Sequence, residues 1–218
     1  MRRLLAVGAL VLAGSVVGAG SVQASTITFE DQGFVPMLPF NAEPRFGDLT
    51  SGGFFFDMAG PNPVYQLANN SANIDNGTTY LVTEGAPSLV TFSQVGGAPF
   101  SLNSFDYARW QGPTIGAATI TVTGHRADNT TVTTTLFPVG DFTAGGSGTD
   151  FQTAIFGADW TNLARVDLLG TGATTGTLNY FAIDNVAVNN SPVPEPGTLT
   201  LLSLGSAYLI RRRRRIGR

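Results

Sequence analysis

The sequence predicts an all-β fold, a jelly-roll-like β-sandwich, for residues 25–191. Apolar residues in this region recur with a period of two, which is the pattern of strands with one buried face. The segments are short and are separated by turns rich in Gly, Pro and Asn. No stretch of the region has a sustained helical period. Eight to eleven such strands are typical of a sandwich or a jelly roll.

The first half of the region contains strands separated by long turn-rich passages. Residues 26–30 alternate, with Ile27 and Phe29 on one face. Residues 33–53 are expected to be rich in loops because three prolines interrupt them. The next expected elements are a buried strand at 54–56, a polar turn at 69–77, and strands at 80–82 and 88–92.

The second half holds the clearest signals. Residues 100–110 are the segment richest in aromatic side chains. Residues 118–124 and 130–137 alternate and flank the turn residues 127–129, so they predict a hairpin. The remaining expected elements are strands at 151–156 and 165–169, a short helical turn at 160–164 and a last strand at 180–188.

The amino terminus has the parts of an export signal. Arg2 and Arg3 precede an uncharged apolar run over residues 4–20, and Val22-Gln23-Ala24 offers small residues where signal peptidase reads. Cleavage is therefore expected after Ala24, which makes residues 1–24 a signal peptide. A first core helix is the alternative, and the absence of an amphipathic pattern in the run weighs against it.

The carboxyl terminus, residues 192–218, has three parts in a fixed order. Prolines at its start favour an extended segment that cannot join a sheet. An uncharged apolar run follows, from Gly197 to Ile210, and five consecutive arginines end it. As a helix the run would be roughly 21 Å long, against about 30 Å of membrane hydrocarbon, which is short for a permanent anchor. The arginines would stay on the cytoplasmic side.

This order resembles the PEP-CTERM sorting signal of exported proteins of Gram-negative bacteria. The box of that signal corresponds here to Pro194, Glu195 and Pro196. The resemblance implies that an exosortase-type membrane enzyme recognises the tail and removes it. The protein would then be anchored transiently in the inner membrane and passed to the cell surface or the extracellular matrix. An ordinary short anchor with a basic stop is the alternative.

Charge and cysteine content exclude several classes of function. Residues 25–191 carry four arginines and fourteen acids, a net charge of −10. Such a surface repels phosphate backbones, so nucleic acid is not an expected partner. The chain has no cysteine, which excludes disulfides, thiolate metal sites and thiol nucleophiles. The domain must therefore be stabilised by its core, and calcium is a common additional stabiliser of exported domains.

Two short pieces at opposite ends of the domain contain candidate calcium ligands. Phe29-Glu30-Asp31 follows the first expected strand, and Ile183-Asp184-Asn185-Val186 lies in the last one. The pieces are similar to those of calcium-bearing extracellular jelly rolls, such as MAM-type domains and several carbohydrate-binding modules, in which first and last strands commonly lie side by side. The resemblance implies one structural calcium, held by Glu30, Asp31, Asp184 and Asn185. The alternative is that these are solvated acids at strand ends.

Four further residues are candidates for a ligand surface: Tyr107, Arg109, Trp110 and Trp160. Sugar sites combine aromatic faces with polar groups. The competing interpretation is that the aromatic rings fill the core, and the alternation that puts Phe105 and Tyr107 on one face favours it.

No catalytic constellation is evident. His125, the only histidine, falls opposite the apolar face of its strand and is expected to be solvated. Residues 145–149 do not match the Gly-x-Ser-x-Gly pattern, and Gly170 and Gly172 lack the rest of a dinucleotide loop. We therefore expect a non-catalytic surface or matrix protein. The alternatives are a module that binds exopolysaccharide and, third, a hydrolase of extracellular polysaccharide.

Overall fold

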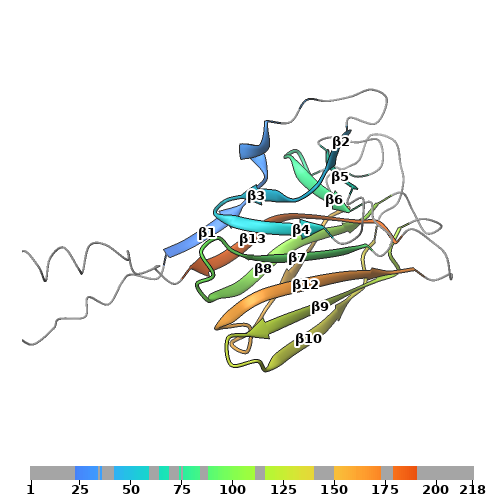
Figure 1. The fold of residues 1–218 in the computed structure, drawn as a ribbon. Coiled ribbons are helices and arrows are strands. Elements are labelled where there is room, and N and C mark those ends of the chain that lie inside the picture. Colours follow the sequence, from blue (N-terminus) through green and yellow to red (C-terminus); the bar gives the residue numbers. More distant parts are fainter. Residues whose placement is uncertain are drawn as a thin grey trace, which may run out of the picture.

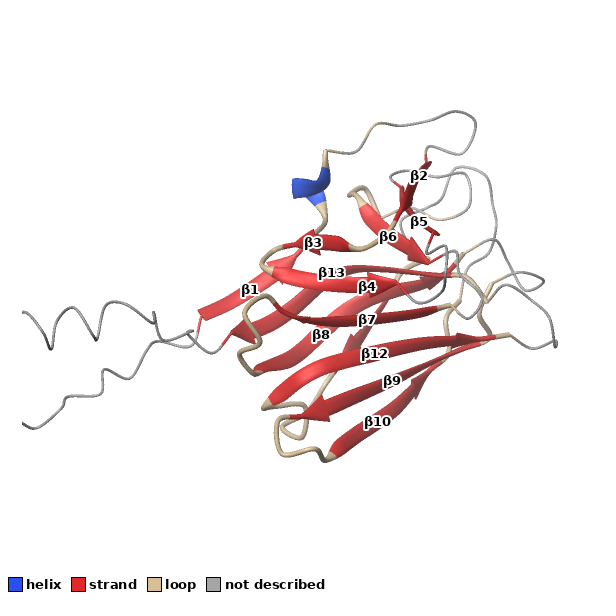
Figure 2. Cartoon of the chain, viewed as in Figure 1, coloured by secondary structure: helices blue, strands red, loops and turns tan. Residues whose placement is uncertain are grey.

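A computed structural model of the chain describes residues 23–33, 35, 42–58, 64–68, 74, 76–83, 88–110, 116–139, 150–172 and 179–190. They form thirteen strands and one short 3-10 helix (Figures 1 and 2). The elements are β1 (Gln23–Ile27), η1 (Glu30–Gln32), β2 (Ala42–Phe46), β3 (Leu49–Ser51), β4 (Phe54–Met58), β5 (Val64–Ala68), β6 (Tyr80–Thr83), β7 (Leu89–Gln94), β8 (Phe100–Arg109), β9 (Thr119–Arg126), β10 (Thr131–Leu136), β11 (Gln152–Ile155), β12 (Leu163–Thr171) and β13 (Phe181–Asn190). No helix in these ranges is long and apolar enough to cross a membrane.

The strands pair antiparallel in two groups. We call β3-β4-β7-β12-β9-β10 the β7 sheet and β2-β5-β6-β13-β8-β11 the β13 sheet. β1 joins the β13 sheet by pairing with the second half of β13. The two sheets are connected at one position, where Leu163 of β12 pairs with Phe100 of β8. The predicted all-β sandwich is thus confirmed, as is the expected pairing of the first and last strands.

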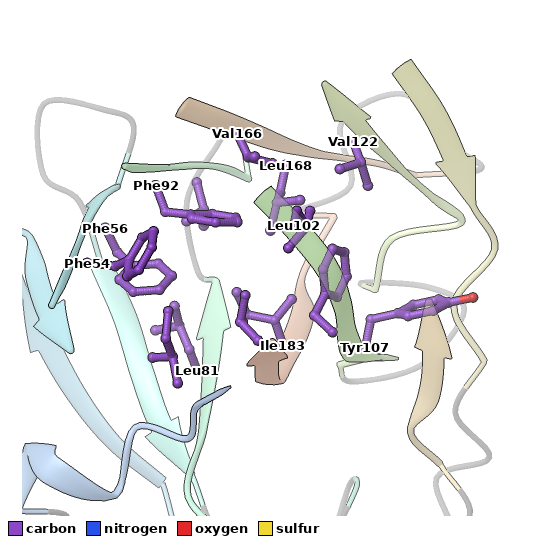
Figure 3. Close-up of a cluster of buried hydrophobic side chains, with 14 of the residues drawn as sticks. Phe54, Phe56, Leu81, Phe92, Leu102, Tyr107, Val122, Val166, Leu168 and Ile183 are labelled. Atoms are coloured by element: carbon purple, nitrogen blue, oxygen red, sulfur yellow. The ribbon is translucent and has the colours of Figure 1, made fainter. Parts of the chain in front are cut away.

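The main core lies between the two sheets. Phe54, Phe56 and Phe92 of the β7 sheet point toward Leu81 and Ile183 of the β13 sheet (Figure 3). The burial pattern of β4 alternates strictly between buried and exposed residues, as a period of two requires. A second, smaller cluster around Tyr80 and Trp110 covers the outer face of the β13 sheet. The central strand β13 is consequently buried on both faces over its first four residues.

The hairpin of β9 and β10 and the last strand lie close to where the sequence places them. Other expectations were wrong. The passage 33–53 contains β2 and β3, and β5 was not predicted. Pro44 is tolerated in β2 because β2 is an edge strand. The expected helical turn at 160–164 is also wrong, since β12 begins at Leu163.

The two ends of the domain meet. Gln23, the first residue of β1, pairs with Asn190, the last residue of β13. The strand thus begins two residues before the boundary predicted for the signal peptide. All other residues of the signal peptide and of the segment 192–218, including Pro194, Glu195 and Pro196, lie outside the described residues.

Candidate functional site

A bulge in β13 positions the candidate site. Phe181 and Ile183 face the core, and so do Val186 and Val188, a spacing that requires one extra residue between the two pairs. The register against β8 shifts after Asp184 to accommodate it. Asn185 occupies the left-handed region there, with φ of 49°, a conformation that Asn adopts more readily than most residues. The bulge leaves Asp184 on the outer face of the sheet, beside Ala182.

Asp184 is fully buried although it is an acid. Its Oδ2 accepts hydrogen bonds from Asn76 Nδ2 and from Thr78 Oγ1, each at 2.7 Å. Its Oδ1 is also buried and has no hydrogen-bond partner among the described residues. Burial raises the pKa of this carboxyl to about 6, and the bonds from Thr78, from Asn76 and from the backbone N–H of Asn185 offset only part of that effect.

The hydrogen bonds around Asp184 leave one oxygen without a donor. The Thr78 hydroxyl lies 2.7 Å from Asp184 Oδ2 and 2.9 Å from Asn76 Oδ1, and its single proton is donated to only one of them. The other oxygen still has a donor, because Asn76 Nδ2 donates to Asp184 Oδ2 and Thr78 N donates to Asn76 Oδ1 at 3.2 Å. Among the described residues, only Asp184 Oδ1 in this cluster lacks a donor. A proton on the carboxyl or a cation would compensate it.

Glu30 contacts the same segment. Phe29, with φ of 57°, turns the chain out of β1 and into η1, which begins with Glu30. The Glu30 carboxylate accepts hydrogen bonds from Thr79 N at 2.7 Å and from Thr79 Oγ1 at 3.1 Å. Glu30 and Asp184, which are far apart in the sequence, therefore hold consecutive residues of the segment Asn76–Thr79.

Asp31 and Asn185, the other two predicted ligands, point elsewhere. Asp31 accepts hydrogen bonds from Ser51 Oγ at 2.6 Å and from Gly52 N at 3.1 Å, which fix η1 to the β3–β4 turn. Desolvation acts against these bonds and a third from Gln32, but together they lower the pKa of Asp31. Asn185 Nδ2 donates to Asp106 Oδ2 at 2.9 Å. The structure therefore brings together only two of the four predicted residues.

Asp184 offers one buried oxygen of the kind that calcium binds. Calcium prefers carboxylate, carbonyl and amide oxygens. Asp184 Oδ1 would be its carboxylate ligand, whereas Asn76 Nδ2 and Thr78 Oγ1 contact the other oxygen, Oδ2. In the described part of the chain no group of three or more His, Cys, Asp and Glu side chains is placed to hold a metal ion. An ion here would thus depend largely on uncharged oxygens. Sequence reasoning missed Asn76 and Thr78, since the predicted polar turn 69–77 includes Asn76 without assigning it a role and ends one residue before Thr78.

The predicted ligand surface is mostly buried. The side chains of Trp110 and Trp160 are 0% and 6% exposed, and that of Tyr107 is 7% exposed. Trp110 packs edge-on against Tyr80, and the ring centroids of Trp160 and Phe156 are 4.5 Å apart. These rings offer no open face for a sugar, so their burial favours the core alternative. Arg109 is half-buried, and its Nε donates to the carbonyl of Ala117 at 3.0 Å.

His125 lies on the outer face of the β7 sheet, as its place in the strand predicts. It is half-buried rather than fully solvated. Its Nε2 lies 2.8 Å from Asp167 Oδ2, and Arg165 flanks the pair. Thr91 Oγ1 donates to the other oxygen of Asp167. This cluster joins β7, β12 and β9 across the sheet.

Comparison with known proteins identifies the tail. Residues 192–215 match the model of the PEP-CTERM protein-sorting motif. The chain carries a PEP-CTERM motif. The motif implies an exported protein with a membrane-anchoring tail that exosortase-type machinery recognises. The PEP-CTERM match begins two residues after the end of β13. Among curated proteins, none matches the chain significantly.

Solved structures resemble the β-domain only distantly. TmCBM61, solved in complex with β-1,4-galactotriose, is 12% identical, with 74% of this chain and 92% of that one covered and a TM-score of 0.35. CBM32-3 from a family 31 glycoside hydrolase of Clostridium perfringens is 11% identical, with 63% of this chain and 74% of that one covered and a TM-score of 0.30. The CBM22-1–CBM22-2 tandem of Paenibacillus barcinonensis Xyn10C is 14% identical, with 82% of this chain and 52% of that one covered and a TM-score of 0.27. Likenesses at this level carry no conclusion about function.

Proposed function

We propose that this chain is a non-catalytic surface or matrix protein of a Gram-negative bacterium, delivered by its PEP-CTERM tail. The observation that carries the proposal is the position of the motif directly after the last strand. Removal of the tail would leave all thirteen strands in place. Signal peptidase would process the amino terminus, and an exosortase-type enzyme would remove the tail from its transient place in the inner membrane.

The proposal is tested by measuring the intact mass of the protein released from the cell surface. We expect a mass that lacks residues 211–218, and a variant in which Pro194, Glu195 and Pro196 are all replaced by Ala should keep them and stay with the membrane. The replacement leaves the apolar run unchanged, so it separates recognition of the box from simple anchoring. Released wild-type protein that still carries Arg218 would contradict the proposal.

We further propose that Asp184 binds a calcium ion that stabilises the domain. The buried Asp184 Oδ1, which has no hydrogen-bond partner among the described residues, supports this. A cation bound only by the folded state raises its stability by mass action. We expect the full chain, in a neutral detergent at pH 7, to unfold at a higher temperature in millimolar calcium than in chelator. The shift should be absent in Asp184→Ala, and equal midpoints for the wild type would contradict a bound ion.

A further inference from the structure

β10 forms the border of the β7 sheet. It pairs with β9 along its whole length, and no other described strand pairs with it. Figure 1 shows it as the lowest strand of the sheet. A border strand presents a row of unpaired backbone donors and acceptors to the solvent, which makes it a template for pairing with another chain.

The other borders among the described strands have features that discourage such pairing. β2 contains Pro44 between two charged residues, Glu43 and Arg45. β3 and β11 have only three and four residues. β1 begins at the predicted cleavage site and would keep three of its five residues in the mature chain. Prolines, charges and short length are the devices by which proteins protect sheet edges.

β10 has none of these devices. Residues 130–137 read Thr-Thr-Val-Thr-Thr-Thr-Leu-Phe, eight residues without a charge or a proline. The domain around this strand carries many acids, so the neutral edge is a local feature of β10 and not a reflection of the whole surface. Phe137, directly after the strand, is 66% exposed. Such an edge is suited to another neutral, β-forming strand.

The hairpin determines which backbone groups of β10 are free. Arg126 N donates to Thr130 O at 2.8 Å, which makes these two residues a hydrogen-bonded pair. Hydrogen-bonded and non-hydrogen-bonded pairs alternate along an antiparallel ladder. With the observed register, Val132, Thr134 and Leu136 therefore bond to β9. The alternate residues are Thr131, Thr133 and Thr135. Their N–H and C=O groups point away from β9, to the open edge.

We infer that β10 pairs antiparallel with β10 of a second copy of this chain, about a two-fold axis at Thr134. In this register Thr133 forms a hydrogen-bonded pair with Thr135 of the second copy, so the free groups of both edges are used. Val132 lies opposite Leu136 of the second copy. Both side chains are half-buried and pack on the core, so pairing continues the core of one copy into the other. A two-fold contact of this kind closes and does not propagate.

Cysteine cross-linking tests the contact and its register, because the chain has no cysteine of its own. Opposed residues in a non-hydrogen-bonded pair have Cα atoms about 4.5 Å apart, within the range of a disulfide. In the full chain in neutral detergent, Thr134→Cys should form a covalent dimer on mild oxidation. Val132→Cys and Leu136→Cys should do so efficiently only when the two variants are mixed. Thr50→Cys, on the short exposed border strand β3, is the matched control and should give on the order of tenfold less dimer.

A proline scan tests the hydrogen bonds without a cross-link. Thr133→Pro removes an N–H that points to the open edge and leaves the ladder with β9 intact. It should weaken the dimer on the order of tenfold in sedimentation equilibrium, at an unchanged unfolding midpoint of the dilute monomer. Thr134→Pro removes a bond to β9, so it should lower that midpoint. The inference is overturned if Thr134→Cys cross-links no better than Thr50→Cys, if Thr133→Cys alone cross-links better than Thr134→Cys, or if Thr133→Pro dimerises like the wild type.

Discussion

Replacing Asp184 by Asn tests whether this carboxylate is as poorly compensated as its surroundings indicate. The amide has nearly the same shape but no charge. Because the carboxylate is fully buried and one of its oxygens has no partner, the ionised form destabilises the folded state. We therefore expect Asp184→Asn to be more stable than the wild type at neutral pH when calcium is absent.

The pKa sets the magnitude and the pH range. Burial raises the pKa of Asp184 to about 6 from its ordinary 3.8. Well below pH 3.8 the carboxyl is protonated in both the folded and the unfolded state, so it has no effect on stability. Between pH 4 and 6 only the unfolded state loses the proton, and the free energy of unfolding falls as the pH rises. Above pH 6 the loss is complete, at about 3 kcal/mol.

Thermal unfolding of the full chain in neutral detergent with chelator, at pH 4 and at pH 7, measures this loss. A change of 3 kcal/mol corresponds to about 6–12 °C in Tm for a chain of this size. Asp184→Asn should exceed the wild type by up to that amount at pH 7 and by little at pH 4. Millimolar calcium should close the gap at pH 7 by stabilising the wild type alone.

Asp57→Asn, which neutralises an exposed acid on β4, is the control for the change in net charge and should stay within about 0.5 kcal/mol of the wild type. If Asp184→Asn is no more stable than the wild type in chelator at pH 7, the carboxylate is stabilised by a contact that the structure does not show. The reasoning from its burial would then be wrong.

Three further predictions concern packing and η1. Gly170→Ala should lower the free energy of unfolding by about 1–3 kcal/mol or more, because the new Cβ would lie 2.5 Å from the carbonyl oxygen of Asn179. Gly157→Ala, whose new Cβ would meet nothing within 4 Å, should be nearly neutral in the same urea titration. Phe92→Ala should lower the free energy of unfolding by about 3–5 kcal/mol, since the ring is fully buried among other aromatic rings. Asp31→Asn should destabilise the chain at pH 7, and the difference should shrink as the pH falls through the lowered pKa of the carboxyl.

The sequence predicted the strands whose apolar residues alternate. The hairpin of β9 and β10 and the last strand were found because one face of each is apolar and the turns between strands have the usual residues. β2 was missed for the converse reason. Its sequence, Ala-Glu-Pro-Arg-Phe, reads as a loop, and only its place at a sheet border makes the proline and the charges compatible with a strand.

The candidate site was predicted in part, because its contacts join distant residues. Asp184 and Glu30 were found through short pieces with a family resemblance. Asn76 and Thr78 lie more than 100 positions before Asp184, and nothing in their own segment indicates a contact with it. Trp110 shows the opposite difficulty. An exposed sugar platform and a core side chain have the same residue type, and only the fold distinguishes them.

The bulge at Asn185 links the core to the candidate site. In a regular strand, Phe181 and Ile183 would share a face with residues 185 and 187, so Val186 and Val188 would leave the core. One extra residue restores all four apolar side chains to the inner face. The same residue ends the regular pairing directly after Asp184 and turns Asn185 toward Asp106. The burial of Asp184 is therefore tied to the register that builds the core. A chain that kept the core pattern without the bulge could not retain this polar cluster. The carboxylate therefore has to be compensated by protonation or by a cation, because a shift of the strand would disrupt the core.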